Sequence, residues 1–252
     1  MRFSYFKILL KQRSITVAGK RVTEDVYLRN GDTVEVFADE SKLLKFNFET
    51  VYRDENVIIA VKPRGISSEE FASRVSSTEN VTATLAHRLD TNTRGLIVMS
   101  LNARAEAELA TAFRKGYVIK KYAALVAGEL KEKLDLNAYL VKDSVSGMVK
   151  IYGKQVADSV RIRTEVAPLE AREGATLTEV TLHTGKTHQI RAHLAYAGYP
   201  VIGDTKYGDF EVNRLFRAKR QYLTAYKLAF RIPDGSPLRY LDELTLEIAP
   251  DF

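Results

Sequence analysis

The chain contains no cysteine, which excludes disulfide bridges and thiolate metal sites. It has no apolar run long enough to cross a membrane. The apolar stretch from Phe6 to Leu10 is too short for a secretory leader and is flanked by lysine and arginine. No internal repeat, low-complexity tract or nucleotide-cradling motif is present. These absences predict a soluble cytoplasmic protein that needs no cofactor and no metal.

The 252 residues are enough for one large domain with a small appendage. Lysine and arginine number 38 against 32 aspartates and glutamates, which gives a net charge of +6 and a pI near 9.3. A basic balance of this size allows a nucleic-acid partner without requiring one.

The main secondary structure follows from spacing and turn residues. The sequence predicts a helix over 103–115, capped by Asn102 and stopped by Gly116. Ser67 and Glu70 form a capping-box pattern before a short helix over 68–75. Strands are predicted over 51–62 as a pair, 96–100, 120–128, 176–183 and 244–248, with antiparallel strands between 134 and 171.

One stretch, His87-Arg-Leu-Asp90-Thr-Asn-Thr-Arg-Gly95, places a cation and a carboxylate directly before a turn. Catalytic groups commonly sit on loops held by rigid elements, so Asp90 is well placed for chemistry. Gly95 closes the loop where the backbone needs a conformation that a side chain would resist. Taken alone, these residues favour a weak surface pair between Arg88 and Asp90, because such pairs are common.

A second stretch runs from Thr184-Gly-Lys186 into a helix expected to begin near Thr187 and end at Gly198. The start of that helix, with Lys186 beside it, is suited to a phosphate. Three of the four histidines lie here at a spacing of five (His183, His188 and His193), which is not a helical face repeat. With no cysteine and no acidic cluster nearby, a zinc site is not expected.

Together the two stretches resemble the main motifs of the RluA-type pseudouridine synthases. The first matches His-Arg-Leu-Asp followed by Thr-x-Thr-x-Gly-Leu, and the second matches Thr-Gly-Lys-Thr-His-Gln-Ile-Arg-x-His. The resemblance covers residues 46–250. It implies an α+β fold, with a mainly antiparallel mixed sheet, flanking helices and a central cleft. It also implies that Asp90 is the catalytic carboxylate, that Arg191 pairs with it, and that Tyr122 lies against the target base.

The remaining residues expected to contact RNA belong to the same motifs or to the basic N-terminal region. Arg88 would fill the space left by the flipped uridine or hold its phosphate; the alternative is a salt bridge within the loop. His87 would orient the loop by hydrogen bonding. The full set of expected RNA-binding residues is His87, Arg88, Lys62, Arg94, Lys186, His188, Gln189, Lys20 and Arg21.

Four residues depart from the family pattern, and two of them, Asn92 and Arg94, are expected to alter how the loop meets RNA. Asn92 stands where the family usually has an acidic residue, and Arg94 stands where it usually has a serine. Arg64 stands at a position that is usually small, and Thr224 stands where a histidine is usual.

The N-terminal region is predicted to be a separate module, residues 1–40, joined by a linker over 38–47 to a catalytic domain over 46–252. A basic helix over 3–13, a Val-x-Gly-Lys-Arg-Val segment and a hairpin turning at Asn30-Gly31-Asp32 into strand 33–37 make up its pattern. This pattern resembles the C-terminal half of the alpha-L RNA-binding module of a ribosomal small-subunit protein, in truncated form. The alternative is a small cap that only packs on the main domain.

The resemblance implies an enzyme that isomerises uridine to pseudouridine within RNA, after flipping the base. The carboxylate would attack the sugar carbon 1′, add to the uracil ring, or remove the 2′ proton. Large-subunit ribosomal RNA is the first expected substrate, transfer RNA the second, and the chain is expected to be a monomer. Two other functions stay open: a catalytically silent RNA-binding protein, and a glycosidase that uses Asp90 with Asp204 as paired carboxylates.

Overall fold

The computed structural model describes residue 6 and residues 9–37, 46–143 and 145–252. The chain packs as two compact units, residues 1–47 with 77–80, and residues 48–76 with 81–252. Residues 38–45 of the predicted linker and part of the predicted helix over 3–13 lie outside the described residues; residues 9–11 are helical. In the part of the chain that the structure describes, no helix is both long and apolar enough to span a membrane.

The small unit contains a three-stranded antiparallel sheet in the order β2-β1-β3, formed by β1 (Ile15–Val17), β2 (Lys20–Val22) and β3 (Val34–Val36). The predicted hairpin at Asn30-Gly31 is wrong, because β3 pairs with β1 and not with the residues just before the turn. Strand β1 is central, with β2 on one side and β3 on the other, and its Ile15 is buried with Leu9 and Leu10. Lys20 and Arg21 are exposed, and their RNA contacts stay a prediction, as does the alpha-L resemblance.

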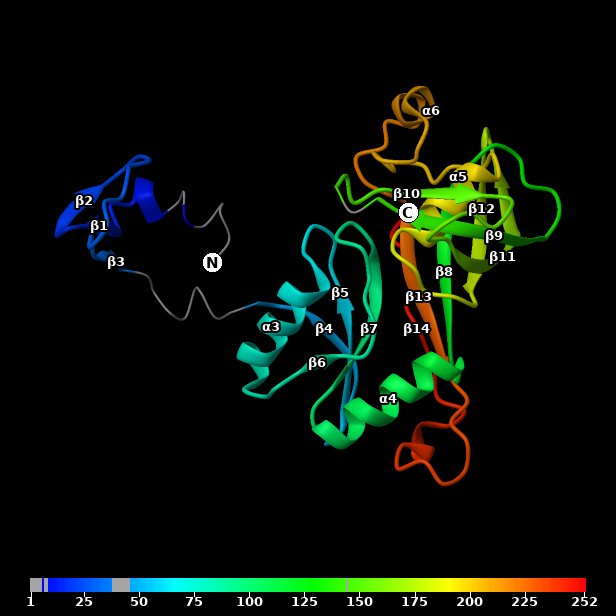
Figure 1. Cartoon of the computed structure of the whole chain (residues 1–252), viewed down its shortest axis with the longest axis horizontal. Helices are drawn as coiled ribbons and strands as arrows, with labels where there is room; N and C mark the ends of the chain where they lie inside the picture. Colours follow the sequence, from blue (N-terminus) through cyan, green and yellow to red (C-terminus); the bar gives the residue numbers. More distant parts are fainter. Residues whose placement is uncertain (1–5, 7–8, 38–45, 144) are drawn as a thin grey trace. The chain divides into compact units, whose positions relative to one another are not determined.

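The large unit is built on one extended, mixed sheet (Figure 1). Its main path runs β10-β9-β11-β12-β8-β13-β7-β5-β4, with β14 added to β13 and β6 to β7. Among the described residues, the one parallel pairing in this sheet joins β7 to β13. This confirms the predicted α+β fold with a mainly antiparallel sheet. The strands are β4 (Glu49–Arg53), β5 (Val57–Lys62), β6 (Thr84–Leu85), β7 (Arg94–Ser100), β8 (Val118–Ala127), β9 (Leu134–Lys142), β10 (Val149–Tyr152), β11 (Val160–Arg172), β12 (Ala175–Leu182), β13 (Leu223–Phe230) and β14 (Thr245–Glu247).

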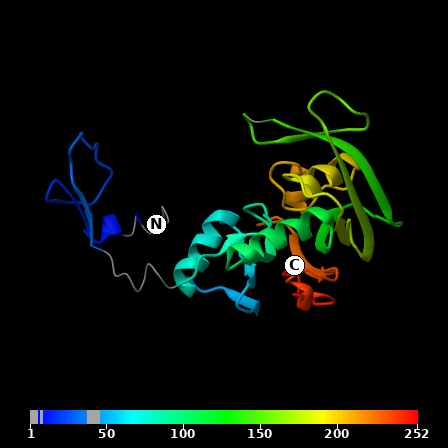
Figure 2. The same ribbon diagram turned by 60° about the horizontal axis from the view of Figure 1, so that its bottom comes forward.

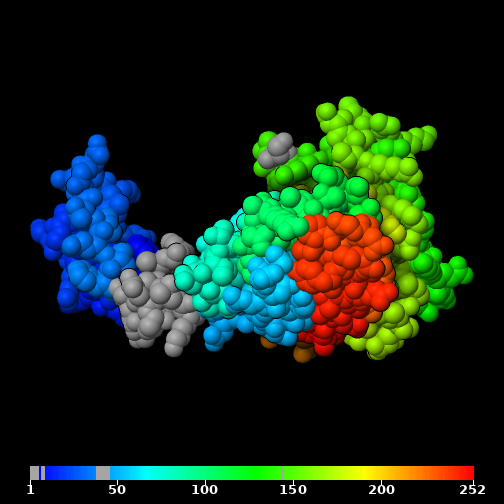
Figure 3. All heavy atoms as spheres, turned by 90° about the horizontal axis from the view of Figure 1, so that it is seen from below, coloured from blue at the N-terminus to red at the C-terminus, as the bar shows by residue number. Residues whose placement is uncertain are grey.

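The helices of this unit are α3 (Ser68–Glu79), α4 (Ala103–Lys115), α5 (Gln189–Tyr196) and α6 (Phe210–Leu215), with a 3₁₀ turn η1 (Arg239–Leu241). Helix α4 packs on β7, and α5 packs on β9–β11 (Figures 1 and 2). The C-terminal residues (red) lie at the surface beside the light-blue β4–β5 segment in Figure 3, where Asn56 donates to the Tyr240 hydroxyl at 3.1 Å.

Local chemistry explains why the predicted elements form. Asn102 caps α4 by accepting from the Ala105 N–H at 2.9 Å, and Gly116 ends it in the left-handed conformation with φ 76°. Every residue of β5 is buried, as expected for a Val/Ile-rich central strand. Helix α3 is longer than predicted and continues to Glu79, with the Ser76 hydroxyl donating to the Ala72 carbonyl inside it.

The parallel contact between β7 and β13 places the central loop. Gly95 lies opposite Ala225, and a Cβ on Gly95 would stand 2.2 Å from the Ala225 carbonyl oxygen. Its φ of 140° is also one that side chains disfavour, so the expected need for glycine is confirmed. Arg94 and Gly95 belong to the strand, and the loop therefore ends at Thr93, directly beside β8 and β13.

Candidate active site

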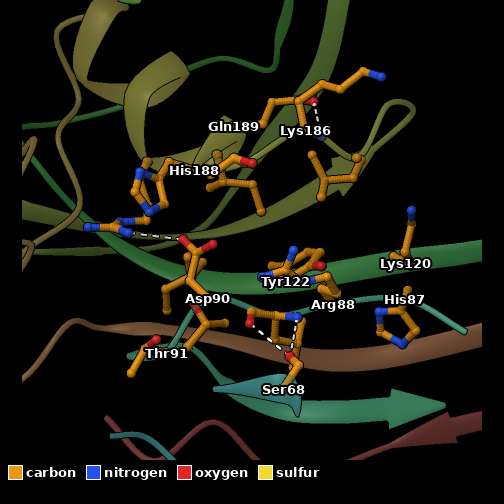
Figure 4. Close-up of a pocket in the computed structure, with 18 of the residues that line it drawn as sticks. Ser68, His87, Arg88, Asp90, Thr91, Lys120, Tyr122, Lys186, His188 and Gln189 are labelled. Atoms are coloured by element: carbon orange, nitrogen blue, oxygen red, sulfur yellow. Dashed lines mark hydrogen bonds and ion pairs between the residues drawn. The ribbon is translucent and has the colours of Figure 1, made fainter. Parts of the chain in front are cut away.

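A cavity of about 720 Å³ opens in the large unit at the central sheet. Its walls come from the loop between β6 and β7, from the first half of β8, from the start of α3, and from the loop between β12 and α5 (Figure 4). Both of the stretches singled out in the sequence therefore border the same cavity, although about one hundred residues separate them.

Asp90 and Arg191 form an ion pair at the cavity wall. Arg191 Nη1 lies 2.9 Å from Asp90 Oδ2, which confirms the predicted pairing. The other side of the guanidinium is held by Asp204, with Nε 2.6 Å from Oδ2 and Nη2 2.9 Å from Oδ1. Arg191 is thus held by a bidentate contact with the buried carboxylate of Asp204. Its remaining guanidinium nitrogen, Nη1, donates to Asp90.

The contacts between Arg191 and Asp204 favour the charged form of both groups. Burial by itself raises the pKa of Asp204, but the hydrogen bonds and charge of Arg191 outweigh it, so the pKa of Asp204 is lowered. Burial lowers the pKa of Arg191, yet its bonds to Asp204 and Asp90 raise it overall. The side chain of Asp90 is 24 % exposed, whereas that of Asp204 is 0 % exposed.

Asp204 therefore cannot act as the second carboxylate of a glycosidase. Its oxygens also accept from the backbone N–H groups of Lys206 and Tyr207 at 2.8 and 3.1 Å, and it does not line the cavity. A glycosidase needs two carboxylates facing the scissile bond, and Asp204 does not face the cavity that Asp90 lines.

Tyr122 comes from β8 and lines the cavity close to Asp90 (Figure 4). The side chain is almost buried, with 6 % exposed. Burial, assisted by the negative charge of Asp90, raises the pKa of Tyr122, so its hydroxyl stays protonated. A flat ring at this position is suited to stacking on a base.

Lys62 was predicted to bind RNA, and the structure gives it another role. Its side chain is fully buried, and its ammonium donates to the carbonyls of Pro63, Ile66 and Thr91 at 2.9, 2.9 and 3.2 Å. Burial lowers the pKa of Lys62 to about 8. With every donor used inside the protein, Lys62 supports the Asp90 loop through Thr91 and has no donor left for RNA.

Gln189 is a second correction of the same kind. It is buried, its Oε1 accepts from the Thr184 hydroxyl and the Lys186 N–H, and its Nε2 donates to the Arg163 carbonyl and the Thr164 hydroxyl. All of its hydrogen-bonding capacity closes the loop at the start of α5.

Arg94, unlike Gln189, does not line the cavity. It lies in β7 and its Nη1 donates to the Ala249 carbonyl at 3.1 Å. Two further departures from the family pattern lie nearby: Arg64 donates to the Thr224 hydroxyl at 3.3 Å and pairs with Asp251 at 2.5 Å. These substitutions thus fasten the C-terminal residues to the sheet.

His87 orients the loop as predicted and also lines the cavity. Its Nε2 accepts from the Val98 N–H at 3.1 Å, and its ring stacks on Phe113 with centroids 4.7 Å apart. Burial, with the nearby charge of Lys120, lowers the pKa of His87 to about 3. The ring is therefore neutral at physiological pH.

The other predicted RNA contacts border the cavity. Arg88 is exposed and pairs with Glu69 of α3 at 2.8 Å, so its partner lies outside the loop. Lys186 is exposed at the opposite rim. His188 adopts φ 53° directly before α5, which makes the helix begin two residues later than predicted, and its Nδ1 lies 2.9 Å from the Tyr207 hydroxyl.

Lys120 and Phe113 are among the cavity residues that the sequence reasoning missed. A signal existed for the first: Lys120 precedes Tyr122 by two positions in a strand, and this period places both on one face. No comparable signal marked Phe113. Among the described residues, no group of three histidine, aspartate or glutamate side chains is arranged to hold a metal ion.

Comparison with known proteins identifies the family. The model of the RNA pseudouridylate synthase family matches residues 11–196, which include both Asp90 and Arg191. The chain belongs to this family of RNA-isomerising enzymes.

The relatives agree with that family. The ribosomal large subunit pseudouridine synthase C of Vibrio cholerae is 30 % identical over 253 residues, covering 89 % of this chain and 79 % of its own. The transfer RNA pseudouridine synthase C of the same organism is 31 % identical over 210 residues, covering 73 % of this chain and 86 % of its own. The structure of human RNA pseudouridylate synthase domain containing 1 aligns with a TM-score of 0.66 at 25 % identity, over 81 % of this chain and 92 % of that one.

Proposed function

We propose that this pseudouridine synthase modifies specific uridines of large-subunit ribosomal RNA and that Asp90 is its catalytic carboxylate. One observation carries the assignment of the residue: Asp90 is the carboxylate that a buried, doubly anchored arginine holds at the cavity wall. The choice of RNA is supported by the relative named for the ribosomal large subunit, and transfer RNA is the alternative that the second relative supports.

The geometry leaves one oxygen of Asp90 for the reaction. Oδ2 is bonded to Arg191, and Oδ1 has no hydrogen-bond partner among the described residues. Attack on carbon 1′, addition to the uracil ring and removal of the 2′ proton would each use that oxygen. Arg191 would hold the carboxylate in one orientation throughout, so that no reorganisation is needed when the glycosidic bond breaks.

The target uridine must leave its stack to reach Asp90, which costs a few kcal/mol. Tyr122 would receive the freed uracil on its ring and keep it in the cavity while it rotates. Arg88 stands at the rim with only an exposed, weak ion pair to Glu69 to give up. We assign it to the space that the flipped nucleotide leaves.

The test uses RNA from a host that lacks the gene, incubated with the protein and mapped by carbodiimide primer extension. The wild-type protein should give a new stop at defined uridines of large-subunit RNA. Asp90→Asn should reduce the rate about 10⁴-fold or more, as for other catalytic groups that act as a unit. Asp135→Asn, which changes an exposed aspartate paired with Arg163, is the matched control and should retain activity.

The outcomes separate the alternatives. Primer-extension stops confined to transfer RNA would show that transfer RNA is the substrate and would leave the proposed role of Asp90 unchanged. A stop that survives Asp90→Asn would refute the role of Asp90. RNA binding with no new stop on any ribosomal or transfer RNA would favour the silent RNA-binding protein.

A further inference from the structure

The cavity extends past Tyr122 to a second end that the proposed reaction does not use. Lys120 lies there, two residues before Tyr122 in β8 and on the same face of the strand. In Figure 4, Lys120 and His87 lie toward one end of the cavity, while Asp90 and His188 lie toward the other. Two strand residues span about 7 Å, so Lys120 lies about the length of one nucleotide from Tyr122 along the strand.

Lys120 is a cation without a counter-charge. Among the described residues no carboxylate pairs with it, whereas its neighbour Lys121, on the opposite face of the strand, pairs with Glu179 at 2.7 Å. The Lys120 ammonium lies 5.7 Å from the centroid of the Phe113 ring. Burial lowers the pKa of Lys120, and no carboxylate counters that effect. An unpaired, partly desolvated ammonium is costly, and an anionic ligand would remove that cost.

The surroundings of Lys120 are suited to an anion with a bulky shape. The nearest loop is Thr184-Gly185-Lys186, and a Cβ added to Gly185 would lie 3.4 Å from the Lys120 Nζ. The glycine therefore leaves the backbone open beside the ammonium, and the exposed Lys186 adds a second cation at the rim. His87, the remaining polar neighbour, is neutral and brings no competing negative charge.

We propose that the Lys120 end of the cavity binds a phosphodiester of the RNA strand, next to the nucleotide whose base reaches Asp90. Lys120 donates to the phosphate oxygens from within the cavity, and Lys186 approaches from the rim. This inference rests on the proposed function, because it names the part of the RNA substrate that the second end holds. It makes Lys120 a binding residue that fixes the strand register and leaves the chemistry to Asp90.

The test compares Lys120→Gln with Lys121→Gln. The two positions are adjacent, the substitutions remove the same charge, and only Lys120 faces the cavity. Urea unfolding first shows that both variants fold. The probe is an oligouridylate of ten nucleotides with a 5′ fluorophore. Its binding is measured by fluorescence anisotropy at several potassium chloride concentrations. One phosphate contact on a single strand contributes about 0.7 to the slope of log K against log salt.

We expect Lys120→Gln to lower that slope by about 0.7 and to weaken binding about tenfold at low salt, as for a lost hydrogen bond to a charged group. Lys121→Gln should match the wild type in both quantities. Equal slopes for Lys120→Gln and the wild type would overturn the proposal. So would a slope that falls by the same amount in both variants, because the effect would then be general charge.

Pseudouridine mapping with the same proteins separates this inference from the proposed function. If Asp90→Asn abolishes the stops and Lys120→Gln leaves the salt slope unchanged, the function stands and the phosphate site fails. If the wild type gives no stops and Lys120→Gln still lowers the slope, the phosphate site stands and the function fails.

Discussion

The two loops that border the cavity are built in contrasting ways. The loop of residues 86–93, which carries Asp90, is fastened along its length by buried polar groups from other segments. The Ser68 hydroxyl both accepts from the Leu89 N–H and donates to the Leu89 carbonyl, each at 2.9 Å. The Thr91 carbonyl accepts from the Gly65 N–H at 2.9 Å and from the Lys62 ammonium at 3.2 Å. We call this the fixed loop.

The loop of residues 183–188 is fastened mainly at its base, and we call it the open loop. Gln189 binds the Thr184 hydroxyl and the Lys186 N–H from inside the protein. Beyond that anchor, Gly185, Lys186 and Thr187 are exposed.

The difference matches the two tasks that the cavity must perform. A reacting carboxylate gains from a position that is set before the substrate arrives, because the protein then needs no reorganisation in the transition state. Contacts to an RNA backbone can adapt to the strand, and an exposed tip anchored at its base permits that. In the proposed function, catalysis therefore belongs to the fixed loop and RNA binding to the open loop of the same cavity.

Of the changes predicted below, substitution of Lys62 should have the largest effect, because it would loosen the fixed loop. Lys62→Met leaves the buried carbonyls of Pro63, Ile66 and Thr91 without their ammonium donor. We expect a loss of about 3 kcal/mol in the free energy of unfolding, measured in urea. The kcat should fall between about ten- and hundredfold, because Asp90 adjoins the released Thr91.

Lys227→Met is the control for that change, since Lys227 pairs with Glu247 at 3.0 Å on a partly exposed edge. It should cost no more than about 1 kcal/mol. Equal losses in the two variants would mean that Lys62 contributes as an ordinary surface cation and that the loop is held by other groups.

Much of the fold could be read from the sequence because its signals are local. Asn102 and Gly116 bound α4 at the predicted residues, since capping is decided within a few positions. The pairing of β3 was mispredicted because Asn30-Gly31 suggested a hairpin with its nearest neighbours. The observed partner of Val36 is Ile15, far away in the sequence, and a local turn signal carries no information about such a pairing.

The site divides in the same way. The two motifs predicted that Asp90 and Arg191 form a pair, and in the structure the two side chains form an ion pair. The motifs could not separate residues that touch a ligand from residues that hold the loops, because both kinds are polar and lie side by side in the sequence. Lys62 and Gln189 proved to be internal supports, and only their burial shows it.

A smaller effect should come from acidification at the end of the fixed loop. His87 has a pKa of about 3 in the folded chain against 6.5 for the free side chain, so between these values the unfolded chain binds more protons. Stability should therefore fall as the pH falls through this window. A protonated Nε2 would also face the Val98 N–H, donor against donor.

The measurement is the urea unfolding free energy of the wild type and His87→Gln at pH 6.5 and 5. The glutamine can still accept from Val98 but does not titrate. We expect the wild type to lose about 1.5 kcal/mol more than the variant over this interval. His193, whose pKa burial lowers to about 4, contributes equally to both proteins and cancels. Identical losses would show that His87 takes up no proton on unfolding.

The smallest effect should come from the tip of the open loop. Lys186→Gln removes an exposed cation at the rim of the cavity and leaves the anchor at Gln189 in place. We expect KM to rise about threefold at low salt, as for one exposed charge contact, and the change in kcat to stay below about twofold. The rise in KM should disappear near 0.5 M potassium chloride, where the screening length is only several ångströms. A large fall in kcat instead would mean that the open loop helps to set Asp90, and the division between a stiff and an adaptable side would then be wrong.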